Sequence, residues 1–292
     1  MLITSQVMEA PRRARYCAGM SRTASQFGPL LREWRQRRHI SQLDLALQGN
    51  LSSRHLSFLE TGRSQPSREM VLNLAEQLEV PLRERNILLT AAGFAPSFPE
   101  RKLDDPALSV ARQAVELVIQ GHSPYPALAV DRHWTMVAAN DAMAPLLTGV
   151  DPDLLRPPVN VMRVALHPAG LAPRTVNLVE WRTHLLERLR RQVEATADPV
   201  LLALLEELRG YPVPHGPRNS RPARDYAGMV LPFELLTEAG VMAFFSTVTV
   251  FGTPIDITLS ELALECFYPA DAATAEILQR AAGMRRDSAR SG

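Results

Sequence analysis

The sequence predicts a chain of two domains, in which an all-α domain of five helices is followed by an α+β domain with an antiparallel sheet. A length of 292 residues exceeds the usual span of one hydrophobic core, so two domains are expected. Apolar residues recur at helical spacing over about 25–93, with almost no strand pattern. Beyond residue 107, short apolar runs between turn residues predict strands among further helices.

The first domain carries a helix signal in each of five short segments. Four residues at i, i+3, i+4 and i+7 give the first helix one apolar face: Phe27, Leu30, Leu31 and Trp34. Ser41 and Ser52 occupy the N-cap positions of the second and third helices, and Gly62 ends the third. The fourth helix is expected after 65–67, and Pro81 opens the fifth.

Residues 94–106 are rich in proline, glycine and charge, and predict a linker. The second domain is expected over 107–285, between a disordered tail over 1–24 at the start of the chain and a short tail over 286–292 at its end. Its elements are expected in this order: helix 107–120, strands 125–130 and 134–139, helices 140–147, 176–195 and 198–209, a loop over 211–228, strands 229–236, 241–251 and 262–268, and a helix from Ala270. Helices packed on one face of such a sheet are expected to enclose an apolar pocket.

The composition, 46% hydrophobic and 22% charged, is typical of a globular chain. No run approaches the roughly 20 apolar residues of a membrane span, and the N-terminus lacks the continuous apolar region of a secretory signal. A cytoplasmic protein without membrane contact is therefore expected. Cys17 and Cys266 lack the spacing of a disulfide framework or a metal site, so neither a metal nor another cofactor is expected.

Charge is divided unevenly along the chain. The first 68 residues contain eleven arginines and four acidic residues, a net charge of +7. Because the whole chain carries +1, the remaining residues carry −6. A basic module joined to an acidic one predicts a polyanion-binding end and a separate regulatory end.

The segment over 41–63 reads SQLDLALQGNLSSRHLSFLETGR, and it resembles the helix-turn-helix of the XRE (Cro/repressor-like) family of transcriptional regulators. The family positions are matched by Ser41, Gln42, Leu45, Ala46, Gly49, Leu51, Ser52, Leu56, Ser57, Glu60 and Gly62. Asn50 departs from the glycine that the family favours, but asparagine tolerates the left-handed conformation, so the turn is expected to survive. The resemblance implies a lambda-repressor-like fold whose third helix enters the major groove of DNA.

The resemblance and the outward face of the third helix imply a set of DNA-binding residues: Gln42, Ser53, Arg54, His55, Ser57, Arg63, Arg37 and Arg38. Arg54 is expected to read a guanine through its O6 and N7, and Gln42 to hold a phosphate. For Arg37 and Arg38 a solvated surface position is an equal alternative, and His55 could instead pack against its own turn.

Two polar residues of the motif are expected to be structural. Ser52 is interpreted as a helix cap rather than a DNA ligand. In similar proteins a glutamate at the position of Glu60 pairs with an arginine of the first helix, here Arg35. A carboxylate there would otherwise repel phosphate, so the resemblance implies an ion pair between the third helix and the first.

The second half resembles the ligand-binding domain of the MmyB-like regulators, which is PAS-like. Three segments carry the resemblance: YPALAVDRHWTMVAANDAM (125–143), VNLVEWRTHLLERLRR (176–191) and FFSTVTVFGTPIDITLSELALECFYPADAATA (244–275). It implies a hydrophobic small molecule as ligand, with a fatty acid among the candidates. Residues named for the pocket wall are Trp134, Val137, Asn140, Met143, Leu146, Phe245 and Thr247. The alternative is that they are ordinary core residues and that Asn140 is a helix N-cap.

These observations together predict a sequence-specific DNA-binding transcription regulator whose second domain senses a hydrophobic small molecule. A homodimer is expected, because one recognition helix covers a half-site and two copies read a palindromic operator in double-stranded DNA. The alternative is that the second domain is a protein-interaction module without a small ligand. An enzyme is not expected, because the histidines are scattered and no Gly-rich phosphate loop, HExxH or GxSxG motif occurs.

Overall fold

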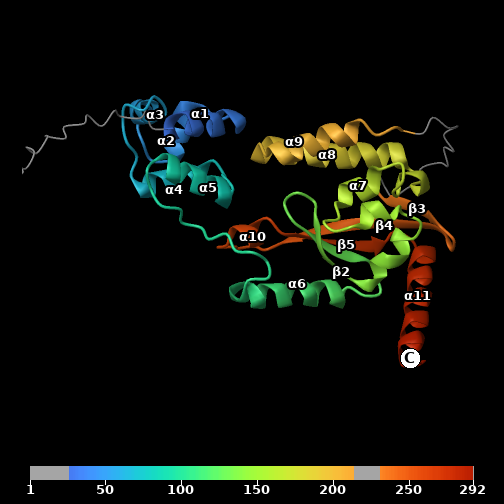
Figure 1. Cartoon of the computed structure of the whole chain (residues 1–292). Coiled ribbons are helices and arrows are strands. Elements are labelled where there is room, and N and C mark those ends of the chain that lie inside the picture. The colour runs from blue at the N-terminus through green and yellow to red at the C-terminus, as the bar shows by residue number, and fades with distance from the viewer. Residues whose placement is uncertain (1–25, 214–230, 292) are drawn as a thin grey trace, which may run out of the picture.

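The computed structural model describes residues 26–213 and 231–291, which form a helical domain followed by a domain built on a β-sheet (Figure 1). Residues 26–93 form five helices: α1 (Phe27–Arg37), α2 (Gln42–Gln48), α3 (Ser53–Glu60), α4 (Arg68–Gln77) and α5 (Leu82–Ala91). The prediction of five helices is confirmed. The predicted tail over 1–24, with Cys17, lies outside the described residues.

Local signals in the sequence account for the helix ends. Ser41, Ser52 and Ser67 each accept a hydrogen bond from the backbone N–H three residues on, at 3.1, 3.1 and 3.2 Å. Asn50 has φ 56° and Gly62 has φ 70°, so the turns after α2 and α3 both use the left-handed region, as predicted. The apolar faces meet in one core, in which these residues are fully buried: Leu31, Leu45, Leu56, Leu74 and Leu89.

The second domain contains helices and an antiparallel sheet, as predicted. Its described helices are α6 (Ser109–Gly121), α7 (Val161–Leu166), α8 (Leu178–Thr196), α9 (Pro199–Arg209), α10 (Ile257–Ser260) and α11 (Ala272–Ser291). Its described strands are β1 (Ala127–Val130), β2 (Met136–Ala139), β3 (Phe233–Thr237), β4 (Gly240–Val250) and β5 (Ala263–Pro269). The described strands form one sheet in the order β2-β1-β5-β4-β3, and every neighbouring pair is antiparallel.

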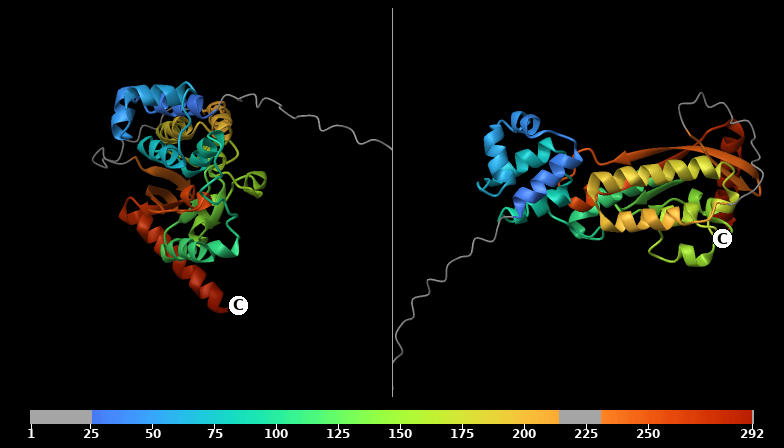
Figure 2. Two further views of the ribbon diagram at one scale, coloured as in Figure 1. Left: turned by 90° about the vertical axis from the view of Figure 1, so that its left-hand side faces the viewer. Right: turned by 90° about the horizontal axis from the view of Figure 1, so that it is seen from above.

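Helices cover both faces of this sheet, so the prediction of helices on one face was wrong. Ala127 and Ala129 of β1 pack with Ile119 of α6. Leu128, between them, belongs to the core on the other face, together with Leu185 of α8. Figure 1 shows α6 beneath the sheet and α8 and α9 above it, and Figure 2 shows α8 and α9 running alongside each other when the molecule is seen from above. A strand that is buried on both faces has apolar residues at successive positions. Its sequence therefore does not indicate which face of the sheet each side chain points to.

Some elements differ from the expectation. The segment over 141–147 is a 3-10 helix with Pro145 inside it, and α7 lies where no helix was expected. α11 continues through Ser291, into the segment where a tail was expected. Most of the predicted loop over 211–228, and the start of the strand predicted over 229–236, lie outside the described residues. In the part of the chain that is described, no helix is long and apolar enough to cross a membrane.

The segment predicted as a linker, over 94–106, has hydrogen bonds with both domains. The side-chain oxygen of Asn86 on α5 accepts hydrogen bonds from the backbone N–H of Ser97 and of Phe98. The backbone carbonyl of Pro99 accepts a hydrogen bond from the N–H of Ile257 at 2.9 Å, at the start of α10. The segment therefore fixes the helical domain next to the connection between β4 and β5.

Candidate nucleic-acid interface and ligand pocket

Helix α3 presents a polar outer face because its apolar residues point into the core. Leu56 is fully buried, whereas Ser53 and Arg54 near the N-terminus of the helix are exposed. His55 and Ser57 are half-buried at the margin of the face. The helix thus carries an exposed guanidinium and small polar side chains at the end that the helix-turn-helix arrangement directs into a major groove.

Phe58 on α3 lies next to two arginines, Arg54 on the same helix and Arg63 in the turn after it, and these contacts were not predicted from the sequence. The guanidinium carbon of Arg54 lies 5.4 Å from the centre of the Phe58 ring, and that of Arg63 lies 5.9 Å from it. Both are within the range of a cation–π contact. Among the described residues neither guanidinium has a hydrogen-bond or ion-pair partner, so both keep their donors for a ligand. The spacing of Arg54 and Phe58, i and i+4 on one helix, was the available signal.

Glu60 joins α1, α2 and α3. Its Oε1 accepts a hydrogen bond from Nε of Arg35 at 2.6 Å, and its Oε2 accepts from Nη2 of Arg35 at 3.0 Å and from Nε2 of Gln42 at 2.7 Å. The predicted ion pair between Arg35 and Glu60 is therefore confirmed. The hydrogen bond to Glu60 raises the pKa of the Arg35 guanidinium. Gln42 is held in place by the same carboxylate, and its second amide hydrogen remains for a phosphate.

Arg37 and Arg38 both lie next to the ring of Trp34 but have different hydrogen-bond partners. Their guanidinium carbons lie 5.3 and 5.7 Å from the ring centre. Arg38 donates to the backbone carbonyls of Leu78 and Glu79, both at 2.9 Å, and so closes the C-terminus of α4. Arg37 pairs with the exposed side chain of Glu33, an interaction that water weakens. Arg37 is therefore the freer of the two for a contact with DNA.

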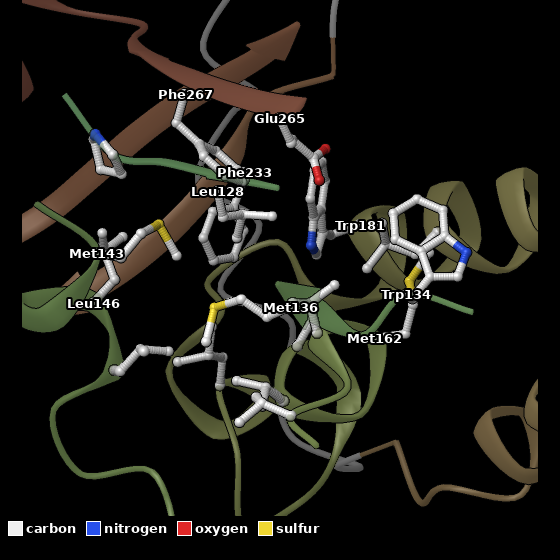
Figure 3. Close-up of a pocket in the computed structure, with 18 residues that line it drawn as sticks. Leu128, Trp134, Met136, Met143, Leu146, Met162, Trp181, Phe233, Glu265 and Phe267 are labelled. Atoms are coloured by element: carbon white, nitrogen blue, oxygen red, sulfur yellow. The ribbon is translucent and has the colours of Figure 1, made fainter. Parts of the chain in front are cut away.

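The second domain encloses an apolar cavity of about 80 Å³, several times the roughly 10 to 15 Å³ that holds one water molecule (Figure 3). It lies between the sheet and the helices α7 and α8. The wall is formed by Pro126, Leu128, Trp134, Met136, Met143, Leu146, Leu147, Val159, Val161, Met162, Val164, Ala165, Leu171, Trp181, Leu185, Phe233, Glu265 and Phe267. Such a wall suits an apolar ligand.

Three of the seven residues named for the pocket line it: Trp134, Met143 and Leu146. Phe245 and Thr247 on β4 do not, because the residues of a strand alternate between its faces and Phe244 belongs to the core on the pocket side. Phe245 instead stacks on Tyr268, with ring centres 5.3 Å apart. The prediction chose the wrong face of β4.

Val137 and Asn140 are also absent from the wall. Ala129 pairs with Ala138 and Val130 pairs with Met136, so Val137 is the extra residue of a β-bulge, and it is exposed.

The side chain of Asn140 is buried and does not cap the helix that follows it. Its Oδ1 accepts from the N–H of Ala127 at 3.1 Å, and its Nδ2 donates to the carbonyls of Ile119 and Tyr125 at 3.1 and 2.8 Å. Asn140 therefore ties the end of α6 to the start of β1, and both interpretations of it, pocket residue and N-cap, are corrected.

A set of ion pairs joins the two domains. Arg83 on α5 donates to both oxygens of Glu261, which follows α10, at 2.8 and 3.0 Å, and to both oxygens of Glu100 at 2.6 and 2.8 Å. The hydrogen bond from Arg83 lowers the pKa of the Glu100 carboxyl. Arg101 donates to Asp256 at 2.9 Å. The helical domain is thus fastened to the β4–β5 connection through α5, and Ser53 and Arg54 on the outer face of α3 stay exposed.

The turn between β1 and β2 extends this contact towards α9. Arg132 lies 3.8 Å from Glu261 and 3.4 Å from Asp198, and Nε2 of His133 lies 2.8 Å from Asp198. Burial alone would raise the pKa of the Asp198 carboxyl, but the hydrogen bonds from His133 and from the backbone of α9, with the nearby arginine, hold that pKa below its ordinary value.

The next residue of the same turn, Trp134, is part of the pocket wall. Its backbone has φ 66°, a left-handed conformation that is costly for a bulky side chain. Its indole N–H donates to Gln192 at 2.8 Å, and the amide of Gln192 donates to the carbonyl of Arg132 at 3.0 Å. One turn therefore touches both the pocket and the ion pairs between the domains.

Comparison with known proteins matches two parts of the chain to two family models. The family model described as the MmyB-like transcription regulator ligand binding domain matches residues 111–281, which is more than half of the 292 residues. The chain belongs to the MmyB-like transcription regulators. A second model, described as helix-turn-helix, matches residues 31–85. This MmyB-like regulator therefore combines a DNA-binding helix-turn-helix of the XRE type with a ligand-binding domain, as the sequence predicts.

Two solved structures are similar to part of this MmyB-like chain. The restriction-modification controller protein C.AhdI from Aeromonas hydrophila is 32% identical, with 21% of this chain and 94% of that chain covered and a TM-score of 0.20. The clp gene regulator ClgR from Corynebacterium glutamicum is 25% identical, with 35% of this chain and 94% of that chain covered and a TM-score of 0.22. With TM-scores this low, neither likeness bears on the structure of the regulator as a whole. No curated protein matches the chain.

Proposed function

We propose that this regulator binds a palindromic operator as a homodimer through the outer face of α3 and that a hydrophobic small molecule in its second domain changes its affinity for DNA. The observation that carries the DNA-binding part is the pair of exposed guanidinium groups, those of Arg54 and Arg63, next to the ring of Phe58. Both lie in a basic part of an otherwise acidic chain.

Arg54 is proposed to read a guanine, since a guanidinium can grip O6 and N7 of that base at once. Phosphate contacts are proposed for Gln42, Arg63 and Arg37, and base or phosphate contacts for Ser53 and Ser57. Arg38 and His55 are assigned supporting positions, because Arg38 closes α4 and His55 is half-buried.

The ligand-sensing part rests on the apolar cavity between the sheet and α7 and α8. The family resemblance makes a fatty acid one candidate for the ligand. It also suggests that the domain is PAS-like, and the antiparallel five-stranded sheet of the described residues is compatible with a PAS-like fold. We also propose a cytoplasmic location, where the protein would meet both DNA and a metabolite.

A route from pocket to DNA is part of the proposal. A ligand alters DNA affinity only if it binds one conformation better than another. The β1–β2 turn can supply two such conformations, because Trp134 lines the pocket in a strained backbone conformation while Arg132 meets Glu261, the partner of Arg83 on α5. A ligand that moves the indole of Trp134 would therefore change how α5 is held.

Selection of bound sites from random duplexes tests the DNA-binding part, and a palindrome is the expected result. Arg54→Ala should lose discrimination at one base step by about 1 to 3 kcal/mol, because the bidentate contact is lost. Gln42→Ala should weaken all sites together, and Arg63→Ala should lower the slope of log affinity against log salt by about one. The matched control is Arg112→Ala, on α6 of the second domain, which should change none of these quantities.

Mass spectrometry of the gently purified, then denatured, protein tests the ligand-sensing part. A retained apolar molecule, together with a change in operator affinity when the protein is stripped and reloaded, is the expected outcome. Equal operator affinity with and without every molecule found would refute the switch. It would favour the second candidate, in which the domain is a protein-interaction module that recruits a partner to DNA.

A further inference from the structure

One ionisable side chain lines the apolar cavity in the part of the chain that the structure describes. Glu265 lies on β5, the central strand, and its side chain is 9% exposed. Every other residue of the wall is aliphatic or aromatic, or is a methionine or proline. Figure 3 shows Glu265 descending from the sheet with its carboxylate among these side chains. A charged group so nearly buried needs partners, because an unpaired polar atom away from water costs free energy.

The partners of Glu265 occupy only one of its two oxygens. Oε1 accepts from Nη1 of Arg188 at 2.9 Å and from the hydroxyl of Ser246 at 3.2 Å. Oε2 has no hydrogen-bond partner among the described residues. Arg188 is absent from the cavity wall, since its guanidinium lies over the ring of Trp134, 4.4 Å from the ring centre. An occupant of the cavity therefore meets the carboxylate and not the guanidinium.

We propose that Glu265 makes the cavity selective for an apolar molecule whose polar end donates a hydrogen bond, a hydroxyl or an ammonium group, over a free fatty acid. A donor would satisfy Oε2 through a charge-assisted hydrogen bond. A ligand carboxylate has no hydrogen to donate to Oε2 and would bring a negative charge next to it, while the guanidinium of Arg188 is bound to Oε1 and is not part of the cavity wall. The inference rests on the proposed ligand-sensing function and narrows the class of its ligand.

The alternative is that Glu265 is purely structural, since its pair with Arg188 also fastens α8 to the sheet. If Glu265 is purely structural, ligands of one chain length that differ only in the polar end should bind with similar affinity. Octan-1-ol, octylamine, methyl octanoate and octanoate form such a series, and at neutral pH octanoate carries the negative charge while the ester has neither charge nor donor.

The experiment measures the dissociation constants of the four compounds with the whole purified chain by titration calorimetry. We expect octan-1-ol or octylamine to bind at least about tenfold more tightly than both octanoate and methyl octanoate, which corresponds to about 1.4 kcal/mol. In Glu265→Gln this ratio should fall to about threefold or less. The matched control is Glu206→Gln on α9, an exposed position that loses the same charge, and it should keep the wild-type ratio.

Each result decides the proposal. Octanoate or the ester binding as tightly as the alcohol and the amine overturns the selectivity while the ligand-sensing function stands. The selectivity is also overturned if Glu265→Gln binds all four compounds with the wild-type ratio. No binding of any of the four to the wild-type chain overturns the ligand-sensing function, and the selectivity with it. The wild-type series decides between these outcomes even if the Glu265 variant fails to fold.

Discussion

Glu60 is a buried carboxylate on which the first three helices meet. Its side chain is 2% exposed and accepts hydrogen bonds from Arg35, which is 11% exposed, and from Gln42. A buried ion pair contributes little compared with an apolar pair of the same shape, because both charges are taken out of water. Removing one partner of such a pair strongly destabilises a protein, because the remaining charge stays buried without a counter-ion.

Glu60→Gln should therefore destabilise the helical domain by about 3 kcal/mol, because Arg35 would keep its charge but lose its counter-ion. Hydrogen exchange of the slowest backbone amides in α1–α3, in the whole chain, measures this loss as a local free energy of opening. Glu33→Gln is the control. Glu33 pairs with Arg37 at an exposed site, so its loss should cost less than about 1 kcal/mol. Equal losses in the two variants would contradict a structural role for Glu60.

For single residues, the sequence predicted the side-chain contacts between positions of the helix-turn-helix motif. It did not predict contacts of residues outside these positions. The pair of Arg35 and Glu60 followed from the family resemblance and is confirmed. Phe58 lies at no motif position, so its contacts with Arg54 and Arg63 were not foreseen. The contact with Arg63 depends on how the chain turns after α3, and that geometry comes from the packed domain.

Helices and strands were predictable to different degrees. A helix that is half exposed shows its buried face through a spacing of three and four residues, as in the first helix, and cap residues and Pro81 marked the starts of other helices in the first domain. β4 is harder, because helices cover both faces of the sheet and apolar residues such as Phe244 and Phe245 follow each other. The strand was found, but its pocket-facing side was not.

The contact between α5 and the connection after α10 had no local signal in the sequence. Arg83 and Glu261 are 178 residues apart, and either would pass for an ordinary surface charge. Arg83 pairs with two carboxylates. One belongs to Glu100, in the segment that follows the helical domain, and the other to Glu261, in the second domain. The two pairs provide a matched comparison, because only one of them joins the domains.

Glu261→Gln should loosen the docking of the helical domain, whereas Glu100→Gln should not. We expect backbone amides over 82–91 and 257–262 to exchange about fivefold faster in the Glu261 variant, equivalent to about 1 kcal/mol for a partly exposed pair. Hydrogen–deuterium exchange followed by mass spectrometry measures this in the whole chain. The same acceleration in both variants would mean that the charge of Arg83, rather than the link between the domains, controls the exchange.

At the scale of the whole molecule, the helical domain is attached through α5, and within the part of the chain that the structure describes α3 lies away from the second domain (Figure 1). One α3 offers few residues to a duplex, and a single half-site supplies little sequence information. In the proposed homodimer, two copies related by a two-fold axis would read two half-sites about one helical turn apart, so the spacing of the half-sites would become part of the recognition. Each of the two copies would then bring the net charge of +7 of its first 68 residues to the same operator, which would strengthen binding to the phosphates.

Operator spacing is therefore expected to control affinity. Adding about five base pairs between the selected half-sites turns one of them to the opposite side of the duplex, so a dimer can no longer reach both. Affinity should fall to the level of a single half-site, and the complex on the original operator should contain two chains per duplex by sedimentation analysis. Adding about five base pairs outside the palindrome is the control and should change nothing. If the spaced operator kept full affinity, each chain would be reading its half-site alone, and the proposed homodimer would have no part in recognition.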